Sequence, residues 1–165
     1  MLSNTKIKDF IIRAATREDV PTILQFIKAL AEYENMLDEV VATEEFLIDV
    51  LFNQRKAEVI IGIYQQNPVC FALFFHNFST FLGKSGIYIE DLYVKPEMRG
   101  KGFGKIVLSY LANIALERNC GRLEWSCLDW NTPSIQFYKQ MGAIPMEEWT
   151  MYRLQGNGLI NLAKQ

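Results

Sequence analysis

The sequence predicts an α/β domain in which a mixed β-sheet carries helices on its faces. Short apolar runs typical of strands alternate along the chain with longer segments whose apolar residues recur at helical spacing. The predicted order is one strand, two helices, three strands, a helix, a strand, a helix and two final strands. Because the chain has 165 residues, is half apolar and shows no linker or repeat, we expect one domain spanning residues 1–165.

The first third of the chain predicts a strand followed by two helices. Residues 10–15 form a short apolar run, and Thr16 follows as a helix N-cap with Glu18 and Asp19 in the first turn. Apolar residues then recur at the spacing of a helix that buries one face. A second helix is expected from Thr43, and its inward face would consist of Phe46, Leu47, Val50 and Leu51.

The middle of the chain predicts three strands. Residues 57–64 and 69–75 are nearly continuous apolar runs joined by a short turn, so we expect a hairpin that is covered on both faces. A loop over residues 78–86 leads to the third strand, residues 87–94. Two adjacent acids interrupt this third strand, and charges are uncommon in central strands. The acids therefore require a structural or functional explanation.

The last third predicts a helix, a strand, a second helix and a pair of strands. The first helix covers residues 103–118, and an alternating strand follows at residues 122–128. The second helix covers residues 132–141, with Thr132 as its cap and Pro133 at its first position. The final strands are expected at residues 143–147 and 149–154.

Composition and charge exclude several functions. The net charge of −2 argues against nucleic acid as the main partner and is compatible with a cationic substrate. Residues 1–9 are polar rather than signal-like, and the apolar runs are too short to span a membrane. We therefore expect a cytoplasmic protein with no membrane partner. Three cysteines without metal-ligand spacing and a single histidine, His76, predict reduced thiols and no metal site.

A glycine-rich stretch follows the strand at residues 87–94 and predicts a phosphate site. The N–H groups of a first helical turn have no partners within the helix, and the helix dipole favours negative charge there. Glycines let the backbone approach an anion closely, and positive side chains surround them; the residues are Arg99, Gly100, Lys101, Gly102, Gly104 and Lys105. The spacing fits neither the P-loop nor the dinucleotide fingerprint, so a plain loop is the alternative for this stretch alone.

Two motifs together resemble the GNAT superfamily of N-acetyltransferases. The first is R-x-x-G-x-G, formed by Arg99, Gly102 and Gly104, and the second is residues 130–142, with Asn131 before a helix that carries Phe-Tyr. The resemblance implies the GNAT fold and acetyl-CoA as the cosubstrate, with no metal. It implies that the cofactor is bound by the backbone of Leu92, Tyr93 and Val94, by the loop residues Arg99, Gly100, Lys101, Gly102, Phe103, Gly104 and Lys105, and by Asn131, Pro133 and Ser134.

Acetyl transfer to an amine needs a base for the amine and an acid for the leaving thiolate. Adjacent strand residues point to opposite faces, so only one of Glu90 and Asp91 can face the substrate. We expect Glu90 to be the base or a ligand of the amine; the alternative is that both acids only hold the backbone. The resemblance makes Tyr138 the general acid, because a phenol has a proton to give, and a core aromatic residue is the alternative.

Within the superfamily, the closest resemblance is to the diamine acetyltransferases, which include spermidine/spermine and thialysine N-acetyltransferases. It rests on residues 26–34, 89–94, 99–104 and 129–139. It implies a homodimer and a small cationic amine as the substrate, bound by Tyr33, Glu34, Glu90, Asp91, Glu124, Trp125 and Ser126. Without the resemblance, the acidic stretch at residues 32–39 is typical of a solvated helix end.

We therefore expect an N-acetyltransferase that moves acetyl directly from acetyl-CoA to a primary amine of a small cationic acceptor within a ternary complex. A polyamine, a diamine or a thialysine-like compound would be such an acceptor. Two alternatives stay open. One is a protein acetyltransferase that modifies an N-terminus or a lysine, and the other is a non-catalytic acyl-CoA-binding sensor domain.

Overall fold

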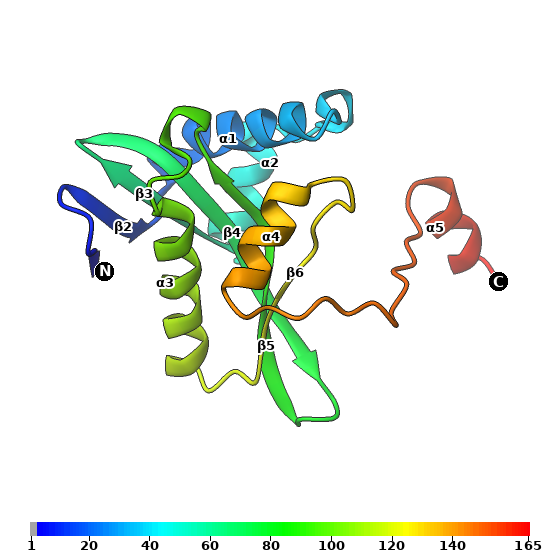
Figure 1. The fold of residues 1–165 in the computed structure, drawn as a ribbon. Coiled ribbons are helices and arrows are strands. Elements are labelled where there is room, and N and C mark those ends of the chain that lie inside the picture. Colours follow the sequence, from blue (N-terminus) through cyan, green and yellow to red (C-terminus); the bar gives the residue numbers. More distant parts are fainter. Residues whose placement is uncertain (1–2) are drawn as a thin grey trace. The chain divides into compact units, whose positions relative to one another are not determined.

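The computed structural model describes residues 3–165, which divide into two compact units; the first ends at Ser126 and the second begins at Cys127. The first unit contains a six-stranded sheet in the order β1-β2-β3-β4-β5-β6 (Figure 1). All neighbouring strands are antiparallel except β5 and β6, which are parallel, so the prediction of a mixed sheet is confirmed. The strands are β1 Ser3–Asn4, β2 Phe10–Ala14, β3 Glu58–Tyr64, β4 Asn67–Ser79, β5 Lys84–Val94 and β6 Leu123–Trp125.

Helices of the first unit cover both faces of this sheet. On one face, Phe26 of α1 stacks on Phe71 of β4, with ring centroids 5.4 Å apart, inside a buried apolar cluster. On the other face, Phe103 at the start of α3 packs edge-on against Phe10 of β2 at 4.5 Å and against Tyr64 of β3 at 5.3 Å. The helices are α1 Val20–Tyr33, α2 Glu44–Ile48 and α3 Phe103–Glu117, and short 3₁₀ or π turns occupy Arg17–Asp19, Leu37–Glu39, Asp49–Asn53 and Pro96–Met98.

The start of α1 is fixed by a charged contact with the first long strand. Asp19 accepts hydrogen bonds from both terminal nitrogens of Arg13 at 2.6 and 2.7 Å, and from the backbone N–H of Thr16 at 2.7 Å. The predicted cap at Thr16 is therefore confirmed. The Arg13 hydrogen bonds lower the pKa of Asp19 to about 2, with the Thr16 contacts adding to this effect.

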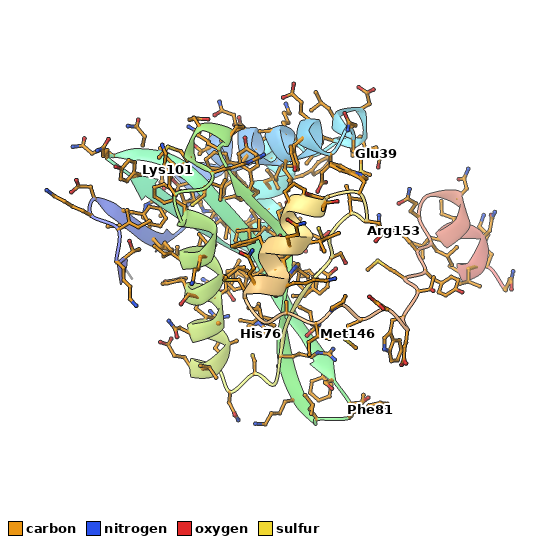
Figure 2. The ribbon with its side chains drawn as sticks, viewed as in Figure 1. Glu39, His76, Phe81, Lys101, Met146 and Arg153 are labelled. Carbon is orange, nitrogen blue, oxygen red and sulfur yellow. The ribbon has the colours of Figure 1, made fainter. Side chains whose placement is uncertain are left out.

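The hairpin between β4 and β5 is longer than the sequence predicts. The expected loop over residues 78–86 is wrong, because Phe78 pairs with Ser85 and Ser79 pairs with Lys84. Phe81 stands at the tip of this hairpin and is 95% exposed (Figure 2). Polar residues and glycines interrupt the apolar residues over 76–86, and most side chains near the tip are exposed, so this part of the hairpin lacks the apolar run by which the other strands were identified.

The second helix begins where predicted but buries less than expected. Thr43 caps α2, and its hydroxyl accepts a hydrogen bond from the backbone N–H of Phe46. Leu51 is buried, whereas Phe46 is 64% exposed and Val50 is exposed as well, so their predicted inward orientation is wrong. The helix gives way to a π turn after Ile48, which changes the spacing at which side chains face the sheet.

The second unit holds two helices, α4 Thr132–Gln140 and α5 Asn157–Ala163. The cap of α4 is Asn131, whose side chain accepts from the backbone N–H of Ser134, and not Thr132 as predicted. The strands predicted at residues 143–147 and 149–154 are wrong, since neither segment pairs with a neighbour in the described chain. Within residues 3–165, no helix has the length and apolar character needed to cross a bilayer.

The contact between Arg13 and Asp19 predicts a pH-dependent loss of stability. Because folding lowers the pKa of Asp19, its ionised form stabilises the folded chain above pH 4, and this contribution is lost as the pH falls toward 2. We expect Asp19→Asn to lower the free energy of unfolding by about 1 kcal/mol at pH 7 and to have little effect near pH 2. Urea unfolding at both pH values measures this, with the exposed Asp38→Asn as the control. An equal loss at both pH values would contradict the assignment.

Candidate functional site

The pairing between β5 and β6 ends early, and this leaves one edge of β5 open. β6 pairs only with Ile87, Tyr88 and Ile89, whereas β5 continues to Val94. On its other side β5 stays paired with β4, with Leu92 opposite Ala72 and Val94 opposite Cys70. The peptide groups of β5 beyond Ile89 therefore face no strand on the β6 side within residues 3–126. A peptide-like ligand can add to such an edge through backbone hydrogen bonds.

A β-bulge explains the two adjacent acids in β5. Leu73 pairs with Asp91 and the next residue of β4, Phe74, pairs with Ile89, so Glu90 is the extra residue in β5. Glu90 is exposed, while Asp91 is partly buried and lies close enough to Glu34 to feel its charge. The bulge thus allows consecutive carboxylates at one point of the strand, where regular alternation would place one of them in the core.

Three acids form a cluster, and within residues 3–165 no arginine or lysine forms an ion pair with any of them. Burial, together with the negative charges of Glu90 and Glu34, raises the pKa of Asp91 to about 6. Burial also raises the pKa of Glu34, which follows the last residue of α1. The carbonyl end of a helix is itself negative, so the position of Glu34 adds to the negative potential. The cluster is therefore suited to bind a cation, which is the role that the sequence predicts for Glu34, Glu90 and Asp91.

The glycine-rich turn lies between β5 and α3, and its backbone conformation agrees with the predicted phosphate site. Gly100 has a φ of +73° and Gly102 a φ of +87°, a region that side chains other than glycine rarely adopt. Apart from the chain neighbours of Gly100, no residue in 3–165 has a heavy atom within 4 Å of the position that a Cβ would take there, so these residues leave the space beside the turn open. Lys101 stands at this turn, beside the first residues of α3 (Figure 2). The predicted residues Phe103, Gly104 and Lys105 form the first turn of α3, whose N–H groups precede its internal hydrogen bonds.

Arg99 links the glycine-rich turn to the end of α1. Its Nε donates to the carbonyl of Val94 at 3.0 Å, and its guanidinium carbon lies 4.5 Å from the centre of the Tyr33 ring. The same guanidinium carbon lies 5.8 Å from the centre of the Tyr93 ring. A small hollow of about 240 Å³ adjoins these side chains and is lined by Ala29, Glu32, Tyr33, Tyr93, Pro96 and Arg99.

Two of the predicted substrate residues, Glu124 in β6 and Ser126 just after it, contact other side chains, and the third, Trp125, is the last residue of β6. Glu124 accepts a hydrogen bond from Asn77 at 2.7 Å and forms an ion pair with Arg122 at 2.8 Å. The hydroxyls of Ser126 and Tyr88 lie 2.6 Å apart. The charge of Glu124 is thus already balanced by Arg122. The sequence analysis did not identify Tyr88 as a contact of the predicted substrate residue Ser126. The register of Tyr88 opposite Glu124 is the signal that could have indicated it, once β5 and β6 were paired.

Four further predicted residues belong to the second unit and are described there alone. Asn131 caps α4, and Pro133 and Ser134 lie in its first turn. Tyr138 lies in the second half of the same helix, with its ring 5.4 Å from the ring of Phe137. The four residues therefore share one helix, as the second motif predicts. Their roles toward the cofactor and substrate stay predictions.

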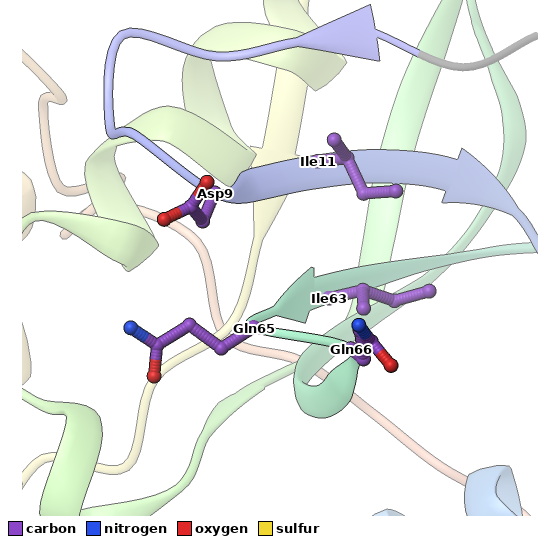
Figure 3. A pocket seen from close by; sticks show the side chains of 5 residues that line it. All are labelled: Asp9, Ile11, Ile63, Gln65 and Gln66. Atoms are coloured by element: carbon purple, nitrogen blue, oxygen red, sulfur yellow. The ribbon is translucent and has the colours of Figure 1, made fainter.

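A second hollow lies at the other edge of the first unit. It has a volume of about 440 Å³ and is lined by Asp9, Ile11, Ile63, Gln65 and Gln66 (Figure 3). None of these residues was predicted to bind substrate or cofactor. Among residues 3–165, no group of three His, Cys, Asp or Glu side chains is arranged to hold a metal ion.

Comparison with known proteins identifies the family to which these features correspond. Residues 25–143 match the model of the acetyltransferase (GNAT) family. The chain is 34% identical to a thialysine N-epsilon-acetyltransferase of Bos taurus, with 93% of this chain and 96% of that protein covered. It is 32% identical to an L-ornithine N5-acetyltransferase of Arabidopsis thaliana, with 90% and 85% covered. Among solved structures, an integron cassette protein from the mobile metagenome of V. cholerae is similar, with a TM-score of 0.80, 28% identity, and 96% and 100% covered.

The acidic cluster predicts an unusual effect of removing a charge. Because folding raises the pKa of Asp91 from its ordinary value to about 6, the folded state loses stability as the pH rises from about 4 to about 6, and the full penalty remains at higher pH. We expect Asp91→Asn to raise the free energy of unfolding by on the order of 1 kcal/mol at pH 8 and to be nearly neutral at pH 4. Urea unfolding at the two pH values measures the difference. Destabilisation at pH 8 would show that Asp91 is not under charge repulsion.

Proposed function

We propose that this chain, which belongs to the acetyltransferase (GNAT) family, transfers acetyl from acetyl-CoA to a primary amine of a small cationic acceptor. The cluster of Glu34, Glu90 and Asp91 carries this proposal, because it places negative charge beside the open edge of β5 and no arginine or lysine of the described residues 3–165 forms an ion pair with it. Two relatives, a thialysine N-epsilon-acetyltransferase and an L-ornithine N5-acetyltransferase, support an amine of this kind. The finer specificity for a diamine or polyamine is part of the proposal.

The residues of the first unit fit the cofactor. The open edge of β5 offers the backbone of Leu92, Tyr93 and Val94 to the amide-containing pantetheine arm. The positive φ of Gly100 and Gly102 and the start of α3 fit the pyrophosphate. When bound, acetyl-CoA supplies the thioester carbonyl that the amine attacks. We further propose that Asn131, Pro133 and Ser134 contact the cofactor from α4.

The acceptor amine would be bound as a cation and must lose a proton before it can attack. Glu34 and Asp91 would hold the ammonium group, because a cation relieves their mutual repulsion. Glu90 is our candidate for the base, acting directly or through a water molecule, since it is the exposed member of the pair at the bulge. Asp91, with its pKa near 6, is the alternative base.

Tyr138 is our candidate for the acid that protonates the departing thiolate, so that the acetyl group passes directly between the two substrates in a ternary complex. Its place in the second half of α4, in the helix that Asn131 caps, supports this assignment. The single domain over residues 1–165, the homodimer and the cytoplasmic location also belong to the proposal.

The proposed activity is tested by thiol release from acetyl-CoA across a panel of amines. The panel holds spermidine, putrescine, ornithine, thialysine, lysine and peptides with a free N-terminus. We expect turnover with small diamines, and we expect Glu34→Gln to raise the KM for the amine about tenfold with little change in the KM for acetyl-CoA. The matched control is Glu39→Gln, an exposed acid five residues further along the chain, which should change neither constant.

The outcomes of this panel separate the possible functions. Turnover with peptides alone would replace the small amine by a protein acceptor. Binding of acetyl-CoA without turnover of any amine would contradict an enzyme and indicate a sensor.

The proposed base and acid predict different effects on turnover. We expect Glu90→Gln to remove the rise of kcat/KM on the acidic side of the pH profile, because the base would be missing.

We expect Tyr138→Phe to lower kcat at least about a hundredfold while leaving the affinity for acetyl-CoA nearly unchanged. Steady-state rates from pH 5 to 10 measure both effects. If Asp91→Asn and not Glu90→Gln removes the acidic rise, the base is Asp91; unchanged turnover in Tyr138→Phe would exclude Tyr138 as the acid.

A further inference from the structure

We propose that Tyr33 is a positioning residue for Arg99 and acts on the cofactor rather than on the amine. This inference rests on the proposed function, because it assumes that the turn carrying Arg99 binds the phosphates of acetyl-CoA. The observation that carries it is the stacking of the two side chains, with the Arg99 guanidinium carbon 4.5 Å from the centre of the Tyr33 ring. A guanidinium at this distance from an aromatic face is attracted by the ring.

Arg99 needs such support because it stands on an exposed turn. Arginine has a long side chain with several free rotations, and an unfixed arginine loses much of this freedom when it binds a phosphate. Two contacts to β5 restrain it, namely the hydrogen bond to the carbonyl of Val94 at 3.0 Å and the more distant ring of Tyr93 at 5.8 Å. Tyr93 is 6% exposed and packs in the core, so it provides a fixed surface below the guanidinium.

Tyr33 supplies the third contact, and it comes from a different element. It is the last residue of α1, whereas Val94 and Tyr93 belong to β5. The guanidinium is therefore held between the helix end and the strand, and the hollow beside it is lined by residues of both. This arrangement fixes the plane of the guanidinium, and a fixed plane favours the paired hydrogen bonds that arginine makes to phosphate oxygens.

The assignment differs from the role that family resemblance gives to Tyr33, which is contact with the amine. Tyr33 and Glu34 are neighbours in the chain, yet they act on different groups. Tyr33 stacks on Arg99, whereas the negative charge of Glu34 raises the pKa of Asp91. The two residues would thus serve the two substrates separately. A change at Tyr33 should then alter the KM for acetyl-CoA, and a change at Glu34 should alter the KM for the amine.

The test compares the variants Tyr33→Leu and Tyr33→Phe in steady-state kinetics and in calorimetric titration with CoA. Leucine removes the aromatic face, whereas phenylalanine keeps it and removes only the hydroxyl. We expect Tyr33→Leu to raise the KM for acetyl-CoA and the Kd for CoA about two- to fivefold, with the KM for the amine unchanged. Tyr33→Phe should keep the wild-type KM for acetyl-CoA and the wild-type Kd for CoA. Tyr33→Met, which keeps an unbranched apolar side chain at the helix end, replaces the leucine variant if that variant has a lower Tm.

A double-mutant cycle with Arg99→Met decides whether Tyr33 acts through Arg99. If it does, Tyr33→Leu will have no further effect on the Kd for CoA once Arg99 is replaced. An undiminished effect in the Arg99→Met background would overturn the proposal, and so would a rise in the KM for the amine alone. Failure of the wild-type protein to bind CoA at all would instead refute the proposed function, and the role of Tyr33 would fall with it.

Discussion

The early end of pairing between β5 and β6 is the constraint on which the candidate site depends. Strand β6 is three residues long, so β5 has a neighbour on both sides only up to Ile89. Just beyond this point the bulge at Glu90 changes which face the side chains of β5 present. The same short stretch therefore exposes peptide groups at its edge and places Glu90 and Asp91 next to each other. The packed helices on both faces keep this irregular strand in place.

Charge is separated along one continuous segment of the chain. The acids Glu90 and Asp91 lie in β5, and the positive residues Arg99, Lys101 and Lys105 follow within the turn and the first residues of α3. The net charge of the whole chain is only −2, so neither group reflects a general excess. An acetyl transfer from acetyl-CoA to an ammonium compound brings together a polyanion and a cation, and this segment offers a complementary region for each.

Much of the first unit could be predicted from sequence because its elements obey local rules. Thr16 and Thr43 are recognisable caps, and the buried strands are apolar runs. The hairpin beyond Phe75 was missed because a solvated pair of strands needs no apolar pattern. The strands expected at residues 143–147 and 149–154 were wrong because a short segment forms a strand only where a partner pairs with it. Within the site, the acids and the glycine turn were visible in the sequence. The stacking of Tyr33 on Arg99 was not, since it is set by packing between elements. The ion pair of Glu124 with Arg122 joins residues two apart at the start of β6, so alternation allows it but does not by itself show that the two side chains pair.

The treatment of acids elsewhere in the fold argues that the cluster at β5 serves binding. Asp19 is paired with Arg13, Glu58 with Arg118, and Glu124 with Arg122. In residues 3–165, no such arginine or lysine partner is recorded for Glu34, Glu90 or Asp91, although burial and repulsion act against the ionised form of Asp91. A partly buried carboxylate without a partner costs stability, and a single basic residue would remove that cost. We propose that the neutralising charge comes from outside the chain, and the ammonium group of the proposed substrate would supply it.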